Sequence, residues 1–231
     1  MKNITSSVYT FEDIVKDDFL YVDKTEFIWN LIRQGKAMYF LSRPRRFGKS
    51  LTVSTLKAVF QGKKELFKGL AIYDKPYDWK QYPVIHLDMG NCQAKTSEEL
   101  NYFLFDTLTL LAEEYNMQLR GQSNATRFEF LIEDIAKETP VVILLDEYDK
   151  PILNTLNTPE TMACRDVLKG FYSSIKKCES KERFVFVTGV TKFCHVSLFS
   201  DLNNLTDISM HRDYATMFGY TQGEFETYFA D

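Results

Sequence analysis

The sequence predicts an α/β fold in which helices cover both faces of a mainly parallel β-sheet. Short apolar runs, bounded by turn or charged residues, alternate along the chain with longer segments of helical spacing. The two most apolar runs, Val141–Leu145 and Phe184–Val187, are continuously hydrophobic. This is typical of central strands that are buried on both faces.

Each element follows from its local pattern. Five short segments rich in aliphatic and aromatic residues are expected to form strands: Ala37–Ser42, Pro83–Met89, Val141–Asp146, Phe184–Thr188 and, with a weaker pattern, Leu205–Ser209. Five longer segments are expected to form helices: Lys24–Arg33, Lys49–Phe60, Ser97–Tyr115, Arg127–Lys137 and Pro159–Lys177. A further helix is expected to begin near Gln222, and residues 61–81 are expected to form an irregular connection.

Composition limits the class of protein. The 231 residues carry 28 Lys and Arg against 32 Asp and Glu, and 45% are hydrophobic, which fits one ordinary globular domain. A net charge of −4 argues against a surface devoted to nucleic acid. The longest aliphatic run, Val141–Leu145, is far shorter than the ~20 residues of a membrane span, and no signal-peptide pattern occurs. We therefore expect a cytoplasmic protein with reduced thiols at its four cysteines, which are Cys92, Cys164, Cys178 and Cys194.

A phosphate-binding loop is expected between the first strand and the helix that follows it. The segment Arg-Pro-Arg-Arg-Phe-Gly-Lys-Ser ends in Gly48, where the backbone can approach a phosphate, in Lys49, which can reach β- and γ-phosphate oxygens, and in Ser50, a Mg²⁺ ligand. The general pattern has glycine where this chain has Arg43, so the start of the loop must differ, because a side chain makes positive φ costly. A coincidental turn is the alternative. The predicted nucleotide-binding residues are Arg43, Pro44, Arg45, Arg46, Phe47, Gly48, Lys49, Ser50 and Leu51.

Two carboxylates follow the most apolar strand. Asp146 is predicted to hold the water shell of Mg²⁺ beside Ser50, and Glu147 is predicted to polarise an attacking water. Such pairs are often solvated loop residues. Here the pair follows a buried strand in a chain that also carries Gly-Lys-Ser, which favours the form of a Walker B element.

The strand at 184–188 runs into further polar residues. Thr188 and Thr191 are candidates for contact with a γ-phosphate, with an ordinary turn or cap contact as the alternative for each. Together with Lys49 and Glu147 they complete the predicted catalytic set. The three histidines, His86, His195 and His211, show no metal-ligand spacing, and Cys194 with His195 is not expected to form a nucleophile pair.

The basic run Arg43, Arg45 and Arg46 has three interpretations. It contacts nucleotide phosphates, forms a nucleic-acid patch, or pairs with local carboxylates. The acidic balance of the chain and the shortness of the run favour the first and the third.

Four segments taken in order carry a family resemblance: Tyr-Val-Asp-Lys-Thr (21–25), Arg-Pro-Arg-Arg-Phe-Gly-Lys-Ser-Leu (43–51), Leu-Leu-Asp-Glu-Tyr-Asp-Lys-Pro (144–151) and Val-Thr-Gly-Val-Thr-Lys-Phe (187–193). With them the chain closely resembles the predicted AAA-ATPase-like family of bacterial P-loop proteins, in which Arg at the first loop position is usual. The resemblance implies that Lys49 binds the β- and γ-phosphates of ATP, Ser50 and Asp146 hold Mg²⁺, and Glu147 orients the hydrolytic water. We therefore expect a three-layer P-loop NTPase core with strand order 5-1-4-3-2.

The resemblance also implies a longer parent chain. Relatives continue into a helical lid and a domain similar to PD-(D/E)XK nucleases, and residues 214–221 look like the junction with the lid. We expect residues 1–231 to form the ATPase core, with residues 1–36 packed on it as a helical and turn segment, and the chain to stop before the lid. DNA is then a partner only through the missing C-terminal part. Residues 11–25 either shape an adenine pocket or form a docking helix and turn.

Several functions stay open beside Mg²⁺-dependent ATP hydrolysis that drives or gates an effector domain. The domain could be a nucleotide-binding switch without turnover, or a nucleic-acid module that acts through Arg43, Arg45 and Arg46. A small-molecule kinase is less favoured, because Asp146 and Glu147 suit water activation. Oligomerisation is open as well, with Arg212 as a candidate for an arginine that acts on a neighbouring subunit.

Overall fold

The computed structural model describes residues 3–5, 7–192, 198–199 and 204–229 of the chain. Its centre is a five-stranded sheet in the order β2-β3-β4-β1-β5, in which every neighbouring pair is parallel. Read from the other edge, this is the predicted order 5-1-4-3-2, so the expected α/β fold with a mainly parallel sheet is confirmed. The strands are β1 (Ala37–Ser42), β2 (Val84–Asp88), β3 (Val141–Asp146), β4 (Glu182–Gly189) and β5 (Thr206–Asp207).

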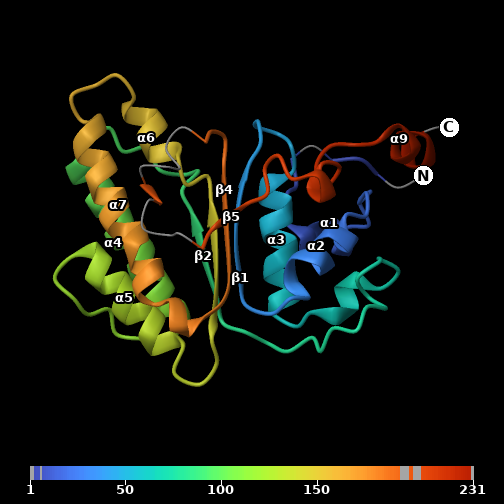
Figure 1. Ribbon diagram of the computed structural model, residues 1–231, viewed down its shortest axis with the longest axis horizontal. Coiled ribbons are helices and arrows are strands. Elements are labelled where there is room, and N and C mark those ends of the chain that lie inside the picture. The colour runs from blue at the N-terminus through green and yellow to red at the C-terminus, as the bar shows by residue number, and fades with distance from the viewer. Residues whose placement is uncertain (1–2, 6, 193–197, 200–203, 230–231) are drawn as a thin grey trace.

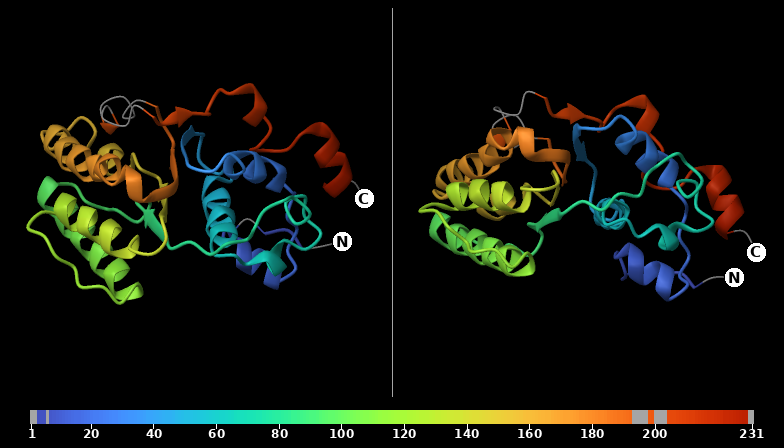
Figure 2. Two further views of the ribbon diagram at one scale, coloured as in Figure 1. Left: turned by 60° about the horizontal axis from the view of Figure 1, so that its bottom comes forward. Right: turned by 90° about the horizontal axis from the view of Figure 1, so that it is seen from below.

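Helices form a layer on each face of the sheet (Figures 1 and 2). One layer holds α4 (Ser97–Glu114), α5 (Asn124–Ile135), α6 (Lys150–Thr155) and α7 (Thr161–Lys177). The other holds α1 (Phe11–Lys16), α2 (Thr25–Ile32) and α3 (Lys49–Phe60). The chain also forms three short 3₁₀ turns, η1 (Lys64–Phe67), η2 (Glu179–Lys181) and η3 (Arg212–Tyr214), and ends its described part with α9 (Gln222–Phe229).

Alternating strand residues supply the two cores. On β3, Ile143 and Leu145 pack toward α4, α5 and α7, whereas Val142 and Leu144 pack toward α1, α2 and α3. All six residues of β3 are buried, as the continuous apolar run predicted. Because the strand is covered on both faces, its end is held rigidly, and the acidic residues there have a fixed position.

Several element bounds differ from those expected. Helix α5 begins at Asn124 rather than Arg127, because Ser123 and Thr126 form a capping box ahead of the apolar stripe. The six residues of α6 show too little periodicity to predict a helix, whereas α1 lies in the segment 11–25, for which a docking helix and turn is one of the two expectations. The last strand is reduced to two residues, Thr206 and Asp207.

Cys92, Cys164 and Cys178 are buried free thiols, while Cys194 and His195 lie outside the described residues. Within the described ranges, no helix has the length and apolar composition needed to cross a membrane.

Glu182, the first residue of β4, should make stability depend on pH. Its side chain is 3% exposed and neither carboxylate oxygen has a hydrogen-bond partner among the described residues. Burial raises the pKa of Glu182 to about 8 in the folded state, against about 4.3 for an exposed glutamate. The folded state therefore holds a proton that the unfolded chain releases, so stability is fully present below the unfolded pKa and declines as pH rises through this window.

We expect Glu182→Gln to remove most of this decline. The variant should resemble the wild type near pH 5 and be more stable near pH 8 by roughly 1–3 kcal/mol, measured by urea unfolding at both pH values. Glu138→Gln, at an exposed glutamate ahead of β3, is the control. Parallel pH profiles for the wild type and Glu182→Gln would contradict the assignment.

Candidate functional site

The carboxyl ends of the parallel strands bring the predicted site residues to one edge of the sheet. Ser42 pairs with Gly189 between β1 and β4, and Asp88 pairs with Asp146 between β2 and β3. The loop from β1 to α3, the acidic pair after β3 and the hydroxyl residues at the end of β4 therefore start side by side. This is the edge at which open parallel sheets bind ligands.

The phosphate loop has its unusual backbone conformations in its second half. Gly48 has φ +80° and Arg46 has φ +64°, whereas Arg43 is not among the residues with positive φ. The start of the loop thus avoids the conformation that would penalise a side chain at position 43, as its sequence required. Helix α3 begins directly after Gly48, so its unpaired N–H groups and its partial positive charge face the loop.

Lys49 is buried inside this loop. Only 5% of the Lys49 surface is exposed, and its Nζ donates a 2.9 Å hydrogen bond to the carbonyl of Pro44. Burial lowers the pKa of Lys49, and the charges of Asp146, Glu147 and Asp149 oppose that shift. The ammonium group therefore lies among carboxylates at the centre of the site, where an anion would compete for it.

Asp146 is buried at the end of β3, with one carboxylate oxygen hydrogen-bonded. It is 4% exposed, and its Oδ1 accepts hydrogen bonds from the Glu147 N–H at 2.9 Å and from the Thr188 hydroxyl. Oδ2 accepts none from the part of the chain that is described. Since Mg²⁺ prefers oxygen ligands and keeps several waters, Asp146 and the Ser50 hydroxyl fit such an ion.

Asp146, Glu147 and Ser50 line one pocket of about 490 Å³, which also reaches His86 and Asp88 on β2. The described residues contain no group of three or more His, Cys, Asp or Glu side chains able to hold a metal by themselves. A Mg²⁺ ion at Ser50 and Asp146 would therefore depend on ligand oxygens from a bound nucleotide, as P-loop sites do.

Glu147 is held in a strained conformation beside this pocket. Its φ of +50° is uncommon for a residue with a side chain. Burial, and then the charge of Asp146, raises the pKa of Glu147, while Lys49 acts in the opposite direction. A Cβ at Gly90 would lie 3.3 Å from Glu147 Oε2, so the glycine leaves room for the carboxylate. A partly desolvated carboxylate of this kind is suited to accept a proton.

The two threonine candidates are directed to different partners. The Thr188 hydroxyl donates to Asp146, which places it at the predicted site. The Thr191 hydroxyl donates to Asp149 Oδ2 at 2.9 Å, and the Thr191 carbonyl accepts from the Tyr148 hydroxyl at 2.8 Å. Of the two, Thr188 is brought beside Asp146, and Thr191 makes the turn contact that was its alternative interpretation.

The three arginines of the basic run are also separated. The Arg43 guanidinium donates to the carbonyl of Ser209 and lies 5.9 Å from the centre of the Phe218 ring. It therefore joins the loop to the C-terminal segment. Arg45 and Arg46 are exposed, and Arg46 lines a second pocket with Phe47 and Gly48.

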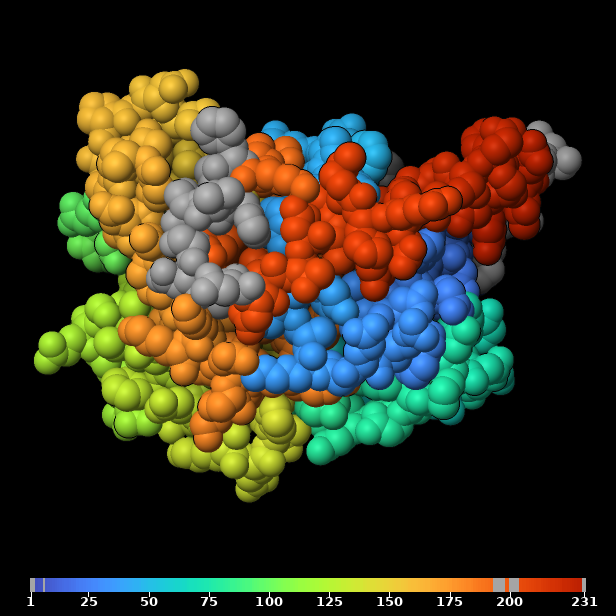
Figure 3. All heavy atoms as spheres, in the orientation of Figure 1, coloured from blue at the N-terminus to red at the C-terminus, as the bar shows by residue number. Residues whose placement is uncertain are grey.

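This second pocket, of about 280 Å³, lies between the loop and both ends of the chain. From the N-terminal side it is lined by Ile14, Leu20, Tyr21 and Val22. The segment 217–220 closes the other side, and Figure 3 shows the red C-terminal part lying against the blue N-terminal part. The segment 11–25 thus both lines a pocket and forms helix α1, which are features of the two interpretations that its sequence leaves open, whereas the sequence does not predict the contribution of 217–220.

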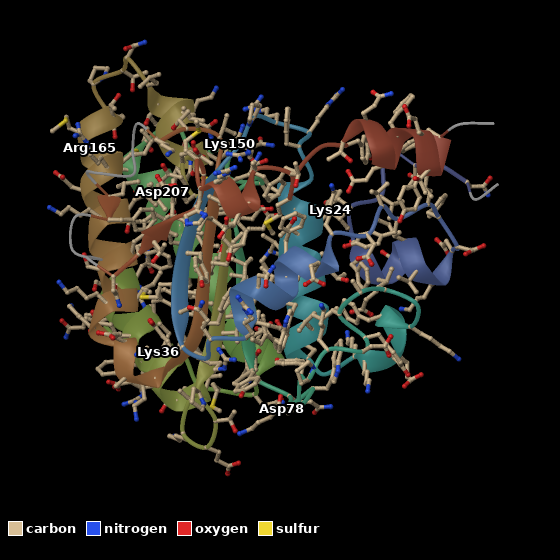
Figure 4. The ribbon with its side chains drawn as sticks, turned by 45° about the vertical axis from the view of Figure 1, so that its right-hand side comes forward. Lys24, Lys36, Asp78, Lys150, Arg165 and Asp207 are labelled. Atoms are coloured by element: carbon tan, nitrogen blue, oxygen red, sulfur yellow. The ribbon has the colours of Figure 1, made fainter. Side chains whose placement is uncertain are left out.

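Lys24 ties the two sides of this pocket together. Its Nζ forms a 2.5 Å ion pair with Glu224 of α9 and donates to the Thr216 carbonyl at 2.8 Å. Figure 4 labels Lys24 next to the red C-terminal segment. The local sequence around Lys24 could not predict this partner, because Glu224 is 200 residues away along the chain.

The loop, the acidic pair and the Thr188 hydroxyl lie together at one edge of the sheet, and this arrangement can now be compared with known proteins. A family model described as a predicted AAA-ATPase matches residues 6–199. The chain belongs to that family. The match includes the phosphate loop, β3 and its acidic pair, and β4, so the predicted AAA-ATPase assignment covers the candidate site. Membership of the family, taken together with the fold, supports a nucleotide-binding domain of the P-loop ATPase type.

The chain is also similar to an uncharacterized protein in the vnfD 5′ region of Azotobacter chroococcum mcd 1. The two are 42% identical over 234 residues, which span 99% of this chain and 45% of that relative. This member of the predicted AAA-ATPase family thus spans less than half the length of the curated relative it matches. Among solved structures, the ORC2 protein of Aeropyrum pernix in ADPNP and ADP complexes aligns with 84% of this chain and 50% of its own, at 12% identity and a TM-score of 0.47.

Proposed function

We propose that this domain binds ATP with Mg²⁺ and hydrolyses it, and that the nucleotide state drives or gates an effector domain C-terminal to it. The observation that carries the proposal is the meeting of two elements at one pocket. Helix α3 brings Ser50 to the same pocket as Asp146, the last residue of β3, and Glu147, which follows it, and Lys49 is buried next to Ser50. That combination serves phosphate binding, metal binding and water activation together.

The roles follow from the contacts. A triphosphate on the loop would face the first N–H groups of α3, and Lys49 would exchange the Pro44 carbonyl for phosphate oxygens. Ser50 and Asp146 would hold Mg²⁺, which neutralises phosphate charge when bound. Glu147 takes a proton from water as the water oxygen bonds to the γ-phosphorus, and the bond from that phosphorus to the β,γ-bridging oxygen breaks to leave ADP.

The pocket between the chain ends is the proposed base site. It adjoins Gly48 and Leu51 of the loop and offers apolar surface from Leu20, Val22 and Met217, which suits a planar heterocycle. The preference for ATP over GTP rests on family membership, since no motif that reads the base is present in the sequence.

Nucleotide binding and turnover need to be measured separately. A fluorescent ATP analogue should bind the purified protein with Mg²⁺, and unlabelled ATP should displace it. Phosphate release from ATP, without any added acceptor, should then exceed the blank and should require Mg²⁺. Binding without phosphate release would favour the nucleotide-switch alternative. Formation of ADP only with an added hydroxyl compound, without free phosphate, would favour a kinase. Absence of binding would contradict the proposal as a whole.

The nucleic-acid alternative is weakened by the engagement of Arg43 with Ser209 and Phe218. The double variant Arg45→Ala/Arg46→Ala tests what is left of it. Affinity for a DNA duplex that does not change in this variant, or does not fall with salt, would exclude the patch.

A further inference from the structure

Two residues that follow the acidic pair connect the end of β3 to the end of β4. Asp149 is 1% exposed, and its carboxylate accepts hydrogen bonds from the N–H of Val190, and from both the N–H and the hydroxyl of Thr191 at 2.8 and 2.9 Å. Tyr148 donates its N–H to the Thr188 carbonyl at 3.0 Å and its hydroxyl to the Thr191 carbonyl at 2.8 Å. The segment 188–191 is therefore fastened to the segment 148–149 on both backbone and side-chain groups.

The carboxylate of Asp149 does not cap helix α6, although Asp149 directly precedes that helix. Asp149 is the residue before helix α6, and aspartate there usually accepts a hydrogen bond from the first turn of its own helix. Asp149 makes no such bond to α6 and instead reaches across to the loop after β4. A buried charge costs free energy unless it is well hydrogen-bonded, so these three donors determine where the carboxylate lies.

Close packing supports the same connection. A Cβ at Gly189 would lie 2.3 Å from the Tyr148 ring and 2.8 Å from Asp149 Oδ1, so the two segments are in direct contact. From the helical layer, the Tyr172 hydroxyl of α7 donates to the Tyr148 carbonyl at 3.0 Å. Residues 148 and 149, which follow Glu147, thus have no space on the side of Gly189 in which to shift unless residues 188–191 shift with them.

Both candidate catalytic side chains next to this connection depend on it. Glu147 lies between Asp146, which accepts its N–H, and Tyr148, which is bonded to Thr188. The Thr188 hydroxyl and the Glu147 N–H converge on the same oxygen of Asp146. A displacement of residues 188–191 would therefore move the Thr188 hydroxyl and the Glu147 turn together.

We infer that Asp149 is a positioning residue, which holds Thr188 against Asp146 and holds Glu147 at the pocket proposed for the terminal phosphate, and so sets both the rate of hydrolysis and the discrimination of ATP from ADP. This inference rests on the proposed ATPase function. Thr191 then acts by its hydrogen bonds to Asp149 and not by contact with the nucleotide. Since the β-phosphate is bound by the loop and α3, affinity for ADP should depend little on Asp149.

Two variants, which differ in their risk to folding, test the inference. Asp149→Asn removes the charge and leaves one neutral acceptor oxygen for the three donors, and Thr191→Val removes only the hydroxyl donor. Thr191→Ser keeps the donor and should restore what Thr191→Val loses. Ser174→Ala is the matched control, because it also removes a buried hydrogen bond, from Ser174 of α7 to the Ala125 carbonyl at 2.9 Å, but lies away from the strand ends.

For each protein the melting temperature, the Kd of ADP, the Kd of ATP and the rate of phosphate release are measured. We expect Asp149→Asn to slow release by on the order of 100-fold and to reduce the ATP to ADP affinity ratio, with the Kd of ADP within about threefold of wild type. Thr191→Val should shift both quantities in the same direction, by a smaller factor. Ser174→Ala should lower the melting temperature alone.

The outcomes separate the two claims. A wild type that binds no nucleotide overturns the proposed function, and this inference with it. A wild type that binds but does not hydrolyse still tests the inference, through the affinity ratio. An unchanged ratio and rate in Asp149→Asn, or losses in Thr191→Val that Thr191→Ser does not restore, overturn the inference alone.

Discussion

Replacing Lys49 by alanine should weaken the binding of ATP by at least about 100-fold and abolish detectable hydrolysis. The lysine is the buried cation at the start of α3, and its present partner, the Pro44 carbonyl, is a neutral acceptor at 2.9 Å. A triphosphate would offer charged oxygens instead, and hydrogen bonds to a charged group contribute about 1.5–3 kcal/mol each. The loss of one such bond corresponds to roughly 10- to 100-fold in Kd, and the loss of two to roughly 100- to 10,000-fold.

The effect of Lys49→Ala should exceed the loss of these bonds, because Lys49 also offsets nearby negative charge. It counteracts the raised pKa of Glu147, and it interacts with Asp146 and Asp149 as well. Without the ammonium group these carboxylates repel an incoming anion and one another. The alanine variant should thus bind ATP poorly even at millimolar nucleotide.

Isothermal titration with ATP and Mg²⁺ measures this prediction directly. Lys169→Ala, at an exposed lysine of α7 on the opposite layer, is the control and should bind as the wild type does. Lys49→Arg keeps the charge but changes its shape, and we expect an intermediate Kd. A Kd within threefold of wild type for Lys49→Ala would show that the loop does not bind the phosphates.

Local sequence patterns were sufficient to predict those parts of the site that lie within a single segment of the chain. Gly48, Lys49 and Ser50 lie at a turn between a strand and a helix, and the sequence marks both elements. Asp146 is the last residue of a six-residue strand that is wholly buried, and Glu147 follows it, so their place at the end of a central strand could be predicted from the apolar run that precedes them. The strand order followed from the family resemblance.

Contacts between distant segments were beyond the reach of these patterns. Thr188 and Thr191 look alike in sequence, yet the strand ends at Gly189, and beyond it the direction of a side chain no longer alternates. Asp149 decides the direction of Thr191 from 42 residues away. Arg43 is likewise directed by the Ser209 carbonyl, 166 residues along the chain, and not by the phosphate loop to which it belongs.

The substitution Glu147→Gln should separate binding from chemistry. Glutamine has nearly the same shape but cannot take the proton of the attacking water, and general base catalysis contributes roughly 10²–10⁴-fold. Phosphate release should therefore fall by at least about 100-fold. Affinity for ATP should be kept or increased, since a negative charge beside Asp146 and Asp88 is removed. Glu113→Gln, at an exposed glutamate of α4, should leave both quantities unchanged.

The pH dependence of the wild type distinguishes a base at Glu147 from a merely electrostatic role. Burial and the Asp146 charge raise the pKa of Glu147, so its carboxylate takes up a proton at a higher pH than an exposed glutamate does. Because only the ionised form accepts a proton from water, phosphate release should decline on acidification at a pH above the ordinary glutamate value. The residual rate of Glu147→Gln should lack that inflection, whereas Glu147→Asp should keep one at a lower overall rate. If the glutamine variant releases phosphate at the wild-type rate with the same pH profile, another group activates the water.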